Sequence, residues 1–317
     1  AFYRRRRRAL GGEPVLALVE EETSRLLLPG WAKGVAVSLA LGLLAATGVS
    51  VALAADALRH EGPITVTAHR GAHARAPENT AASIREAIAA GADYAEIDVQ
   101  LSKDGVLVVT HDSDFSRMAG VAKKVWDLTY AEIRAIPLGA KAAPEFRNEP
   151  APTFDEVLAL ARDRIRLNIE LKYYGDPQPR LAERVVEALQ ARQMTSQVII
   201  QCLEYEPLLE VRRLAPEIPV GYLMSVNAAH PGRLKVNFLG AELSRVTGAF
   251  VQAAHRRGQQ VHVWTVDAPA DMERMIDLGV DDLITNKPEE ALRRVRAYES
   301  LNDSERTLRR VHAWLAH

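Results

Sequence analysis

The feature that most constrains the fold is an alternation of short apolar runs, rich in β-branched residues, with longer stretches of helical periodicity. Strands that alternate with helices form a parallel sheet, and about eight such units close into a barrel. The runs expected to form strands are Ile64–Ala68, Tyr94–Val99, Val106–Thr110, Arg166–Leu171, Val198–Cys202, Pro219–Leu223, Lys235–Leu239, Gln260–Val266 and Asp282–Thr285. The stretches expected to form helices are Ala81–Ala90, Thr153–Arg162, Arg180–Ala191, Tyr205–Leu214, Gly248–Arg257 and Pro269–Leu278. The sequence therefore predicts an α/β fold, a (β/α)8 TIM barrel over residues 64–296.

Two places depart from the regular alternation. Between Val99 and Val106 there is no room for a helix, and Asp104-Gly105 is typical of a hairpin turn. Residues 113–152 have little strand character, and we interpret them as a small insertion over the carboxyl ends of the strands, where long inserts shape substrate access. Residues 297–317 are expected to add one amphipathic C-terminal helix, with Ser304 as a candidate cap.

The composition of the chain limits which kinds of binding partner are expected. The 317 residues, 48% of them hydrophobic, suffice for one large barrel with segments left over. A net charge of −1 and a pI near 6.9 give no reason to expect nucleic acid as a partner. The run from Arg4 to Arg8 is typical of a solvated or membrane-proximal segment. The single Cys202 forms no intrachain disulfide, so cysteine usage does not decide the compartment.

An uncharged segment from Gly34 to Ala55 predicts membrane attachment. At about 1.5 Å per residue it makes a helix of roughly 33 Å, enough to cross a bilayer core of about 30 Å. We predict a transmembrane helix over residues 34–56, with a buried core helix or a cleavable signal peptide as alternatives. The basic juxtamembrane segment 1–33 is then cytoplasmic by the positive-inside rule, and the barrel is extracytoplasmic. A start at Ala1, without methionine, indicates the C-terminal part of a longer membrane protein.

Three acids lie within apolar strands. Glu96 and Asp98 are two residues apart, so their side chains point to the same face, and Glu170 lies in a second buried run. Three carboxylates inside a barrel repel one another and lose hydration unless a cation neutralises them. All-oxygen ligands favour Mg²⁺, Ca²⁺ or Mn²⁺ over zinc. The alternative is that each acid pairs with a basic residue, such as Glu170 with Lys172.

Two histidines complete the pattern. His69 and His111 each follow a predicted strand directly, and two imidazoles beside a carboxylate cluster suggest a general acid and a general base. Arg70 offers a fixed fork for a phosphate group, and Lys172 adds a second positive charge. A metal, two histidines and the two basic side chains together indicate phosphoester chemistry.

Several ordered motifs carry a family resemblance. They are His69-Arg70-Gly71, Pro77-Glu78-Asn79-Thr80, Glu96-Ile97-Asp98-Val99-Gln100, Asp104-Gly105, His111-Asp112, Glu170-Leu171-Lys172, Trp264-Thr265-Val266 and Gly279-Val280-Asp281-Asp282. Over residues 64–293 the chain resembles the glycerophosphodiester phosphodiesterases. The resemblance implies a TIM barrel of the phosphodiesterase type, preceded here by one transmembrane helix, that hydrolyses a glycerophosphodiester to sn-glycerol 3-phosphate and an alcohol.

The resemblance also implies roles for these residues. Glu96, Asp98 and Glu170 would hold a divalent cation, Ca²⁺ or Mg²⁺, that polarises the phosphoryl oxygens. His69 and His111 would be the acid–base pair. The glycerol 2-hydroxyl would attack phosphorus, and water would open the resulting cyclic phosphate.

The remaining motif residues would bind substrate. Arg70 and Lys172 would contact the phosphate, Glu78 would support the site or touch glycerol, and Trp264 would form a wall of the pocket. The alternatives are a helix cap for Asn79 and ordinary barrel core for Trp264.

The chain departs from the family pattern at two positions. Asn286 follows Thr285 where an aspartate is common, and Asp267 stands where asparagine is common. We expect both departures to lie clear of the catalytic residues. Membrane-anchored members of the family make a lysophospholipase D-like or phosphoinositide-type reaction on membrane lipid an alternative, so the partners expected are a glycerophosphodiester or lysolipid and the membrane. An inactive binding barrel is the other alternative.

Overall fold

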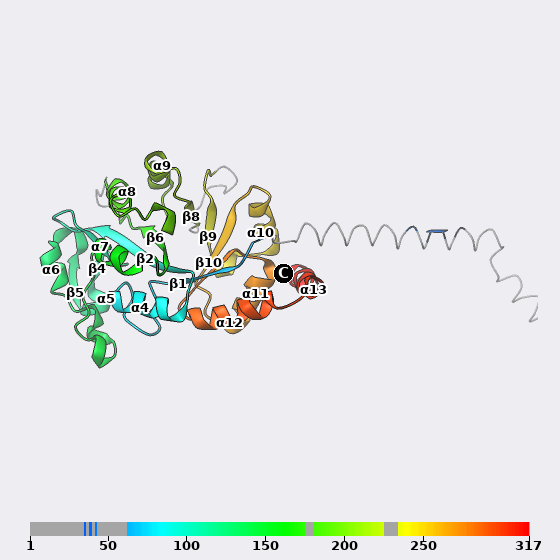
Figure 1. Ribbon diagram of the computed structural model, residues 1–317, viewed down its shortest axis with the longest axis horizontal. Coiled ribbons are helices and arrows are strands. Elements are labelled where there is room, and N and C mark those ends of the chain that lie inside the picture. The colour runs from blue at the N-terminus through cyan, green and yellow to red at the C-terminus, as the bar shows by residue number, and fades with distance from the viewer. Residues whose placement is uncertain are drawn as a thin grey trace, which may run out of the picture. The chain divides into compact units, whose positions relative to one another are not determined.

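A barrel of parallel strands forms the centre of the structure, a computed structural model that describes residues 62–174, 180–224 and 234–316 and the isolated residues 35, 38, 39 and 42 (Figure 1). The barrel strands are β1 (Thr65–Ala68), β2 (Tyr94–Leu101), β6 (Arg166–Leu171), β7 (Val198–Cys202), β8 (Val220–Met224), β9 (Phe238–Glu242), β10 (Gln260–Trp264) and β11 (Asp282–Thr285). Neighbours follow the order β1-β11-β10-β9-β8-β7-β6-β2, and β2 pairs back onto β1. The predicted (β/α)8 barrel is confirmed.

Helices cover the outside of the barrel. They are α4 (Ala81–Ala90), α7 (Phe154–Ala161), α8 (Leu181–Ala191), α9 (Tyr205–Leu214), α10 (Gly248–His255), α11 (Pro269–Leu278) and α12 (Pro288–Glu299). Figure 1 shows α8 and α9 on one side of the strands and α4, α11 and α12 on the other. Local signals define the ends: Thr80 and Thr153 close capping boxes at the starts of α4 and α7, and Gly91 ends α4 at φ 73°.

One predicted strand is displaced along the chain. The sequence analysis placed it at Lys235–Leu239, whereas β9 runs through Gly240 and Ala241, residue types that have little preference for strands. Gly240 is needed there, because a Cβ atom at this position would lie 2.4 Å from Leu223 Cδ2 on the neighbouring β8. The close approach of two strands, which the local sequence does not encode, sets this boundary.

The irregular connection after β2 is the predicted hairpin. Strand β3 (Leu107–Val109) runs antiparallel to β2, with Val99 opposite Val109. The turn is closed by a hydrogen bond from the backbone N–H of Ser102 to the carbonyl of Val106, and Gly105 takes φ 76°. The chain therefore returns to the active-site end of the barrel without a helix.

The segment after His111 forms a small unit with its own core. It contains β4 (Asp114–Phe115), α5 (Ser116–Ala119), β5 (Val121–Lys124), α6 (Tyr130–Arg134) and the short 3-10 helices Val125–Asp127, Leu138–Lys141 and Pro144–Phe146. Its buried side chains pack with Val108 of β3 in a cluster separate from the barrel core, and those of the segment are Phe115, Val125, Leu128, Ile133, Ile136, Leu138 and Ala151. This segment lies where the sequence predicts an insertion, and we refer to residues 113–152 as the insertion.

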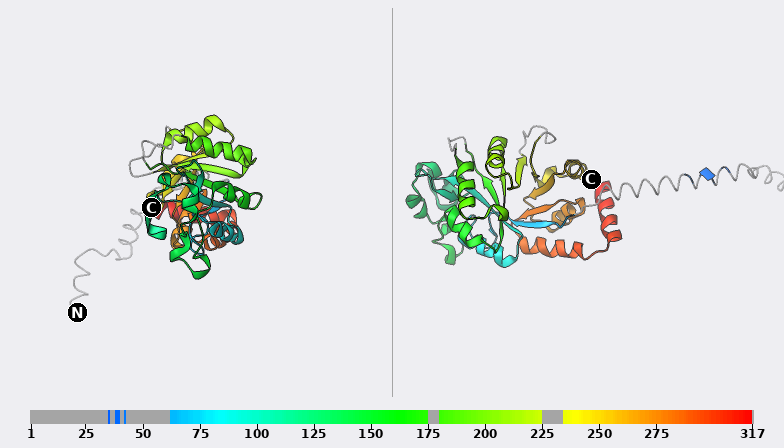
Figure 2. Two further views of the ribbon diagram at one scale, coloured as in Figure 1. Left: turned by 90° about the vertical axis from the view of Figure 1, so that its left-hand side faces the viewer. Right: turned by 45° about the horizontal axis from the view of Figure 1, so that its top comes forward.

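Helix α13 (Asp303–Ala316) follows α12 and packs on α10 and α11; Figure 2 shows it at the end of the barrel domain. The predicted C-terminal helix is present, but Ser304 is not its cap. Asn302 Oδ1 accepts from the N–H of Glu305, and the Glu305 carboxylate accepts from the N–H of Asn302. The helix begins two residues earlier than a cap at Ser304 would require, because this reciprocal pair satisfies its first turn.

The predicted transmembrane helix, residues 34–56, lies outside the described residues apart from the four isolated positions. Among the helices that the structure does describe, none combines the length and the apolar character needed to cross a bilayer.

We expect Gly221→Ala to destabilise the barrel. A Cβ atom at this position would lie 1.9 Å from Cε2 of Phe238, a buried ring that stacks on His262 with a centroid distance of 4.1 Å. Overpacking of this kind costs about 1–3 kcal/mol of unfolding free energy, measurable by thermal melting. Phe238→Leu in the same chain should make room, so the double variant should lose less than the sum of the single losses. Simple additivity would contradict this packing argument.

Candidate active site

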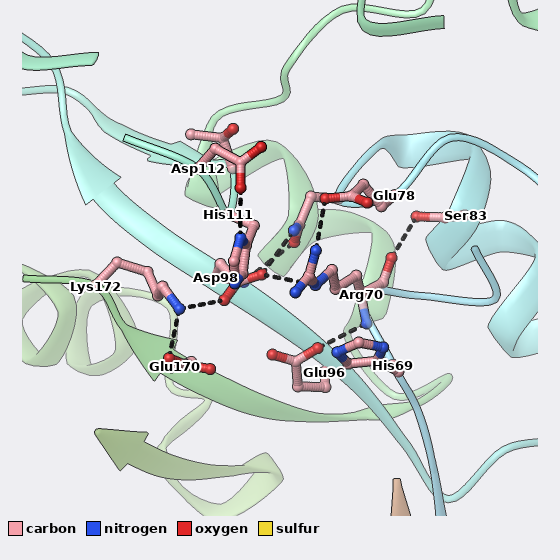
Figure 3. Close-up of polar contacts among 12 residues, drawn as sticks. His69, Arg70, Glu78, Ser83, Glu96, Asp98, His111, Asp112, Glu170 and Lys172 are labelled. Atoms are coloured by element: carbon pink, nitrogen blue, oxygen red, sulfur yellow. Dashed lines mark hydrogen bonds and ion pairs between the residues drawn. The ribbon is translucent and has the colours of Figure 1, made fainter. Parts of the chain in front are cut away.

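The predicted site residues gather at the carboxyl ends of the barrel strands. His69 and Arg70 directly follow β1, Lys172 follows β6, and Trp264 ends β10. A cavity of about 150 Å³ opens there, lined by His69, Arg70, Glu96, His111, Glu170, Lys172, Gln201, Leu203, Leu223, Trp264 and Ile284. Two of the predicted residues, Glu78 and Asp98, do not line the cavity and instead contact residues that do (Figure 3). Trp264 is a wall of this cavity, as expected.

The three acids converge as their strand positions predict. Asp98 on β2 lies opposite Glu170 on β6 in the parallel register, and Glu96 is on the same face of β2. One carboxylate oxygen from each lies within 4.8 Å of the others. Asp98 Oδ1 is buried without a hydrogen bond from the described residues, and its compensation there is the charge of Lys172 Nζ, 3.5 Å away. An all-oxygen set of this size fits a hard divalent cation.

The alternative that an acid of the cluster pairs with a basic residue also holds in part of the site. Lys172 Nζ lies 2.6 Å from Glu170 Oε1 and 3.5 Å from Asp98 Oδ1. Glu96 has no ion pair within the described part of the chain, and its Oε2 accepts the backbone N–H of Arg70 at 2.6 Å. Lys172, together with Arg70 Nε at 3.8 Å from Asp98 Oδ2, therefore offsets part of the negative charge of the cluster.

The pKa values of the three acids are shifted in different directions, because burial opposes ionisation of all three and nearby cations favour ionisation of Asp98. Burial, followed by the neighbouring Asp98, raises the pKa of Glu170 to about 7 and that of Glu96 well above its ordinary value. Burial opposes ionisation of Asp98 too, but Lys172, His111 and other cations lower its pKa. The cluster thus holds one firmly ionised carboxylate and two that keep protons more readily.

His69 is held as a neutral base. Its Nδ1 lies 2.8 Å from Asn286 Oδ1, an atom that can only accept, so Nδ1 carries the proton and Nε2 is free. Burial, and then the charge on Arg70, lowers the pKa of His69 to about 4. An unprotonated imidazole at neutral pH can take a proton from a bound hydroxyl group.

The prediction that the two departures lie clear of the catalytic residues is wrong. Asp267 Oδ2 accepts from Asn286 Nδ2 at 2.6 Å, and Asp267 Oδ1 accepts from the Asn286 backbone N–H at 2.8 Å. These bonds orient the amide whose oxygen meets His69. The contact spans 217 positions in sequence, and it forms because β1 and β11 are neighbours in the closed barrel.

His111 is held by a charged group instead. Its Nδ1 lies 2.8 Å from Asp112 Oδ1. The Gln100 side chain donates to three successive backbone carbonyls, those of Thr110, His111 and Asp112, and so fixes the loop that carries the imidazole. Burial lowers the pKa of His111, while Asp98 and Asp112 act in the opposite direction.

Glu78 and Asn79 support two residues of the site, Arg70 and Asp98, through hydrogen bonds. Glu78 Oε1 accepts from Arg70 Nη1 at 2.9 Å. Asn79, at φ 56°, donates to Asp98 Oδ2 and accepts the Asp98 backbone N–H. The alternative of a helix cap for Asn79 is wrong, because Thr80 caps α4.

Arg117 contacts the site although no motif in the sequence predicts this. This residue of the insertion donates to Asp112 and to both oxygens of Glu78. The only signal available was an arginine six positions after His111 in an otherwise unassigned segment.

Comparisons with known proteins agree with this geometry. A profile of the Glycerophosphoryl diester phosphodiesterase family matches residues 69–290. A glycerophosphodiester phosphodiesterase from Caldanaerobacter subterraneus subsp. tengcongensis is 35% identical over 236 residues, which cover 73% of this chain and 97% of the relative. One from Bacillus subtilis is 32% identical, with 79% and 93% covered. The solved structure of an Oleispira antarctica phosphodiesterase in complex with the product sn-glycerol-3-phosphate superposes with a TM-score of 0.69 at 26% identity, covering 73% of this chain and 96% of that one.

The fold and the site therefore define a phosphodiesterase barrel. The chain belongs to the glycerophosphoryl diester phosphodiesterase family, and it is an enzyme of that family.

We expect cation binding to depend on pH. Because the pKa of Glu170 is raised to about 7 from 4.5, its contribution to the stability of the metal-free protein is present below pH 4.5 and lost as the pH rises through 7. Protons compete with the cation, so Ca²⁺ or Mg²⁺ should raise the melting temperature more at pH 8 than at pH 6. Thermal melting of the full chain with cation or chelator measures this.

Glu170→Gln should reduce the cation's stabilisation, whereas Glu187→Gln on the exposed face of α8 should leave it unchanged. A gain that is equal at both pH values in the native chain would contradict a site built from these carboxylates.

Proposed function

We propose that this site hydrolyses glycerophosphodiesters to sn-glycerol 3-phosphate and an alcohol, with the help of a divalent cation. The observation that carries the proposal is the convergence, around one cavity, of three carboxylates, two basic side chains and two imidazoles held at their Nδ1 atoms. The product bound to the Oleispira antarctica relative supports the substrate class.

Glu96, Asp98 and Glu170 are the residues that would hold the cation, Ca²⁺ or Mg²⁺, as their oxygen atoms suit both. When bound, it would act as a Lewis acid on the phosphoryl oxygens. Lys172 forms ion pairs with two of these acids, and its ammonium group would contact the oxygens of a bound phosphate. The proposed metal dependence is supported by the partly uncompensated charge of the cluster.

The other side chains would bind the phosphate and move protons. Arg70 lies in the cavity wall, and its guanidinium, held by Glu78, would bind phosphate oxygens. His69 would take the proton of the attacking hydroxyl at Nε2, since its Nδ1 proton is held by Asn286. His111 would give a proton to the leaving oxygen, and its hydrogen bond to Asp112 would stabilise the charged imidazolium.

We expect His69→Ala to lower kcat by about 10²–10⁴-fold, the usual range for loss of an acid–base group, and Glu96→Ala, which removes a proposed cation ligand, to abolish the cation-dependent activity. The assay incubates the purified full chain with glycerophosphocholine or glycerophosphoethanolamine and measures sn-glycerol 3-phosphate with Ca²⁺, Mg²⁺ or chelator. His312→Ala, on exposed α13, is the matched control and should keep native activity. Product formation that persists in chelator, or in both active-site variants, would refute the proposal.

A lysophospholipid is a second candidate substrate. One wall of the cavity is apolar, formed by Leu203, Leu223, Trp264 and Ile284, and Leu203 is 45% exposed. Such a surface suits a glycerophosphodiester with an acyl chain nearby. Micelles of lysophosphatidylcholine in the same assay, with lysophosphatidic acid as the measured product, distinguish this activity from hydrolysis of the water-soluble diesters.

We also propose that the enzyme is membrane-attached, with its barrel on the extracytoplasmic side. The support is the uncharged segment within residues 34–56 and the excess of arginine and lysine before it. Protease digestion of the barrel in spheroplasts is expected. Protection from protease until the cells are lysed would overturn this orientation.

A further inference from the structure

One side chain of the insertion reaches the active-site residues from outside the cavity. Arg117 lies on α5, and its side chain is 49% exposed. Its Nε donates to Asp112 Oδ2 at 2.7 Å, and its two terminal nitrogens donate to the Glu78 oxygens at 2.9 and 2.5 Å. The planar guanidinium is thus engaged on two edges by two carboxylates, which fixes their relative position.

The first carboxylate leads to the proposed phosphate-binding arginine. Glu78 Oε1 accepts from Arg70 as well as from Arg117, so the two guanidinium groups share one acceptor. Glu78 is 8% exposed, and a buried carboxylate that lost one of these partners would be free to rotate away from the other. Arg117 therefore restrains Arg70 through Glu78.

The second carboxylate leads to the imidazole on the other side of the site. Asp112 accepts from Arg117 at Oδ2 and contacts His111 Nδ1 at Oδ1, at 2.8 Å. A carboxylate held at both oxygens has one orientation, and it keeps a proton on Nδ1 of the ring. Arg117 therefore also restrains His111 through Asp112.

The insertion holds Arg117 in turn. Lys141 Nζ donates to the backbone carbonyl of Arg117 at 2.7 Å, and Phe115 next to α5 is buried in the separate core of the insertion. The position of the guanidinium thus depends on the packing of residues 113–152 rather than on the barrel alone.

We propose that Arg117 is a positioning residue through which the insertion aligns Arg70 and His111 at once. The insertion thereby completes the active site without entering it, since Arg117 does not line the cavity. The roles of Arg70 and His111 in this inference rest on the proposed function.

The chain offers a matched control. Arg134 lies in the same insertion, its side chain is also 49% exposed, and it bonds to Glu156 at 2.8 Å and to the Tyr130 hydroxyl at 2.6 Å, away from the cavity residues. Arg117→Ala in the full chain should lower kcat by about 10–100-fold, as loss of a supporting partner does, with KM changed less than about threefold. Arg134→Ala should leave both constants at native values.

Chemical rescue separates positioning from general damage. Millimolar guanidinium should restore part of the kcat of Arg117→Ala but not that of His111→Ala, because only the first variant leaves a site shaped for it. Arg117→Lys should not recover kcat, since an ammonium group cannot bridge both carboxylates. The double variant Arg117→Ala with Asp112→Asn should lower kcat by less than the product of the two fold-losses measured in the single variants.

A spectroscopic measurement tests the inference independently of enzyme turnover. In ¹⁵N-histidine-labelled protein, the native His111 ring should be protonated at Nδ1, and Arg117→Ala should mix the two tautomers, with Arg134→Ala unchanged. If the native chain hydrolyses no glycerophosphodiester, the proposed function fails while this readout still tests the inference. A kcat of Arg117→Ala equal to that of Arg134→Ala, a loss confined to KM, or an unaltered His111 ring would overturn it.

Discussion

Buried charge at the mouth of the barrel is the constraint on which the rest of the site depends. Glu96, Asp98 and Glu170 are all at most 8% exposed, and several kcal/mol of desolvation accompany each buried ion. Lys172 and Arg70 offset part of this charge from positions directly after two strands. The result is a cluster of firmly ionised and readily protonated acids whose oxygen atoms lie close enough together to hold a metal ion.

The two histidines differ in what holds them. His69 meets an amide oxygen, oriented by a carboxylate one step further away, whereas His111 meets a carboxylate directly. A neutral acceptor favours the uncharged ring, and a charged acceptor favours imidazolium. Burial lowers the pKa of both imidazoles, and at His111 the Asp112 carboxylate opposes that shift.

Strands and local turns could be read from the sequence, because they depend on neighbours in the chain. The alternation along β2 placed Glu96 and Asp98 on one face, and Asp104-Gly105 marked the hairpin. The start of β9 was misplaced, since its extent depends on Leu223 packing over Gly240. Asn286 was assigned to the periphery, and no local pattern marks its contact with His69, 217 positions away.

The amino-acid sequence by itself determined the barrel class, the acidic cluster and the two imidazoles, because strand periodicity and short motifs act over a few residues. Only the tertiary structure decided what supports them: closure of β1 against β11 brings Asn286 to His69, and folding of the insertion brings Arg117 to Glu78, 39 positions away. Such contacts depend on barrel closure and on a separate small core, and neither leaves a signature in the residues that finally touch.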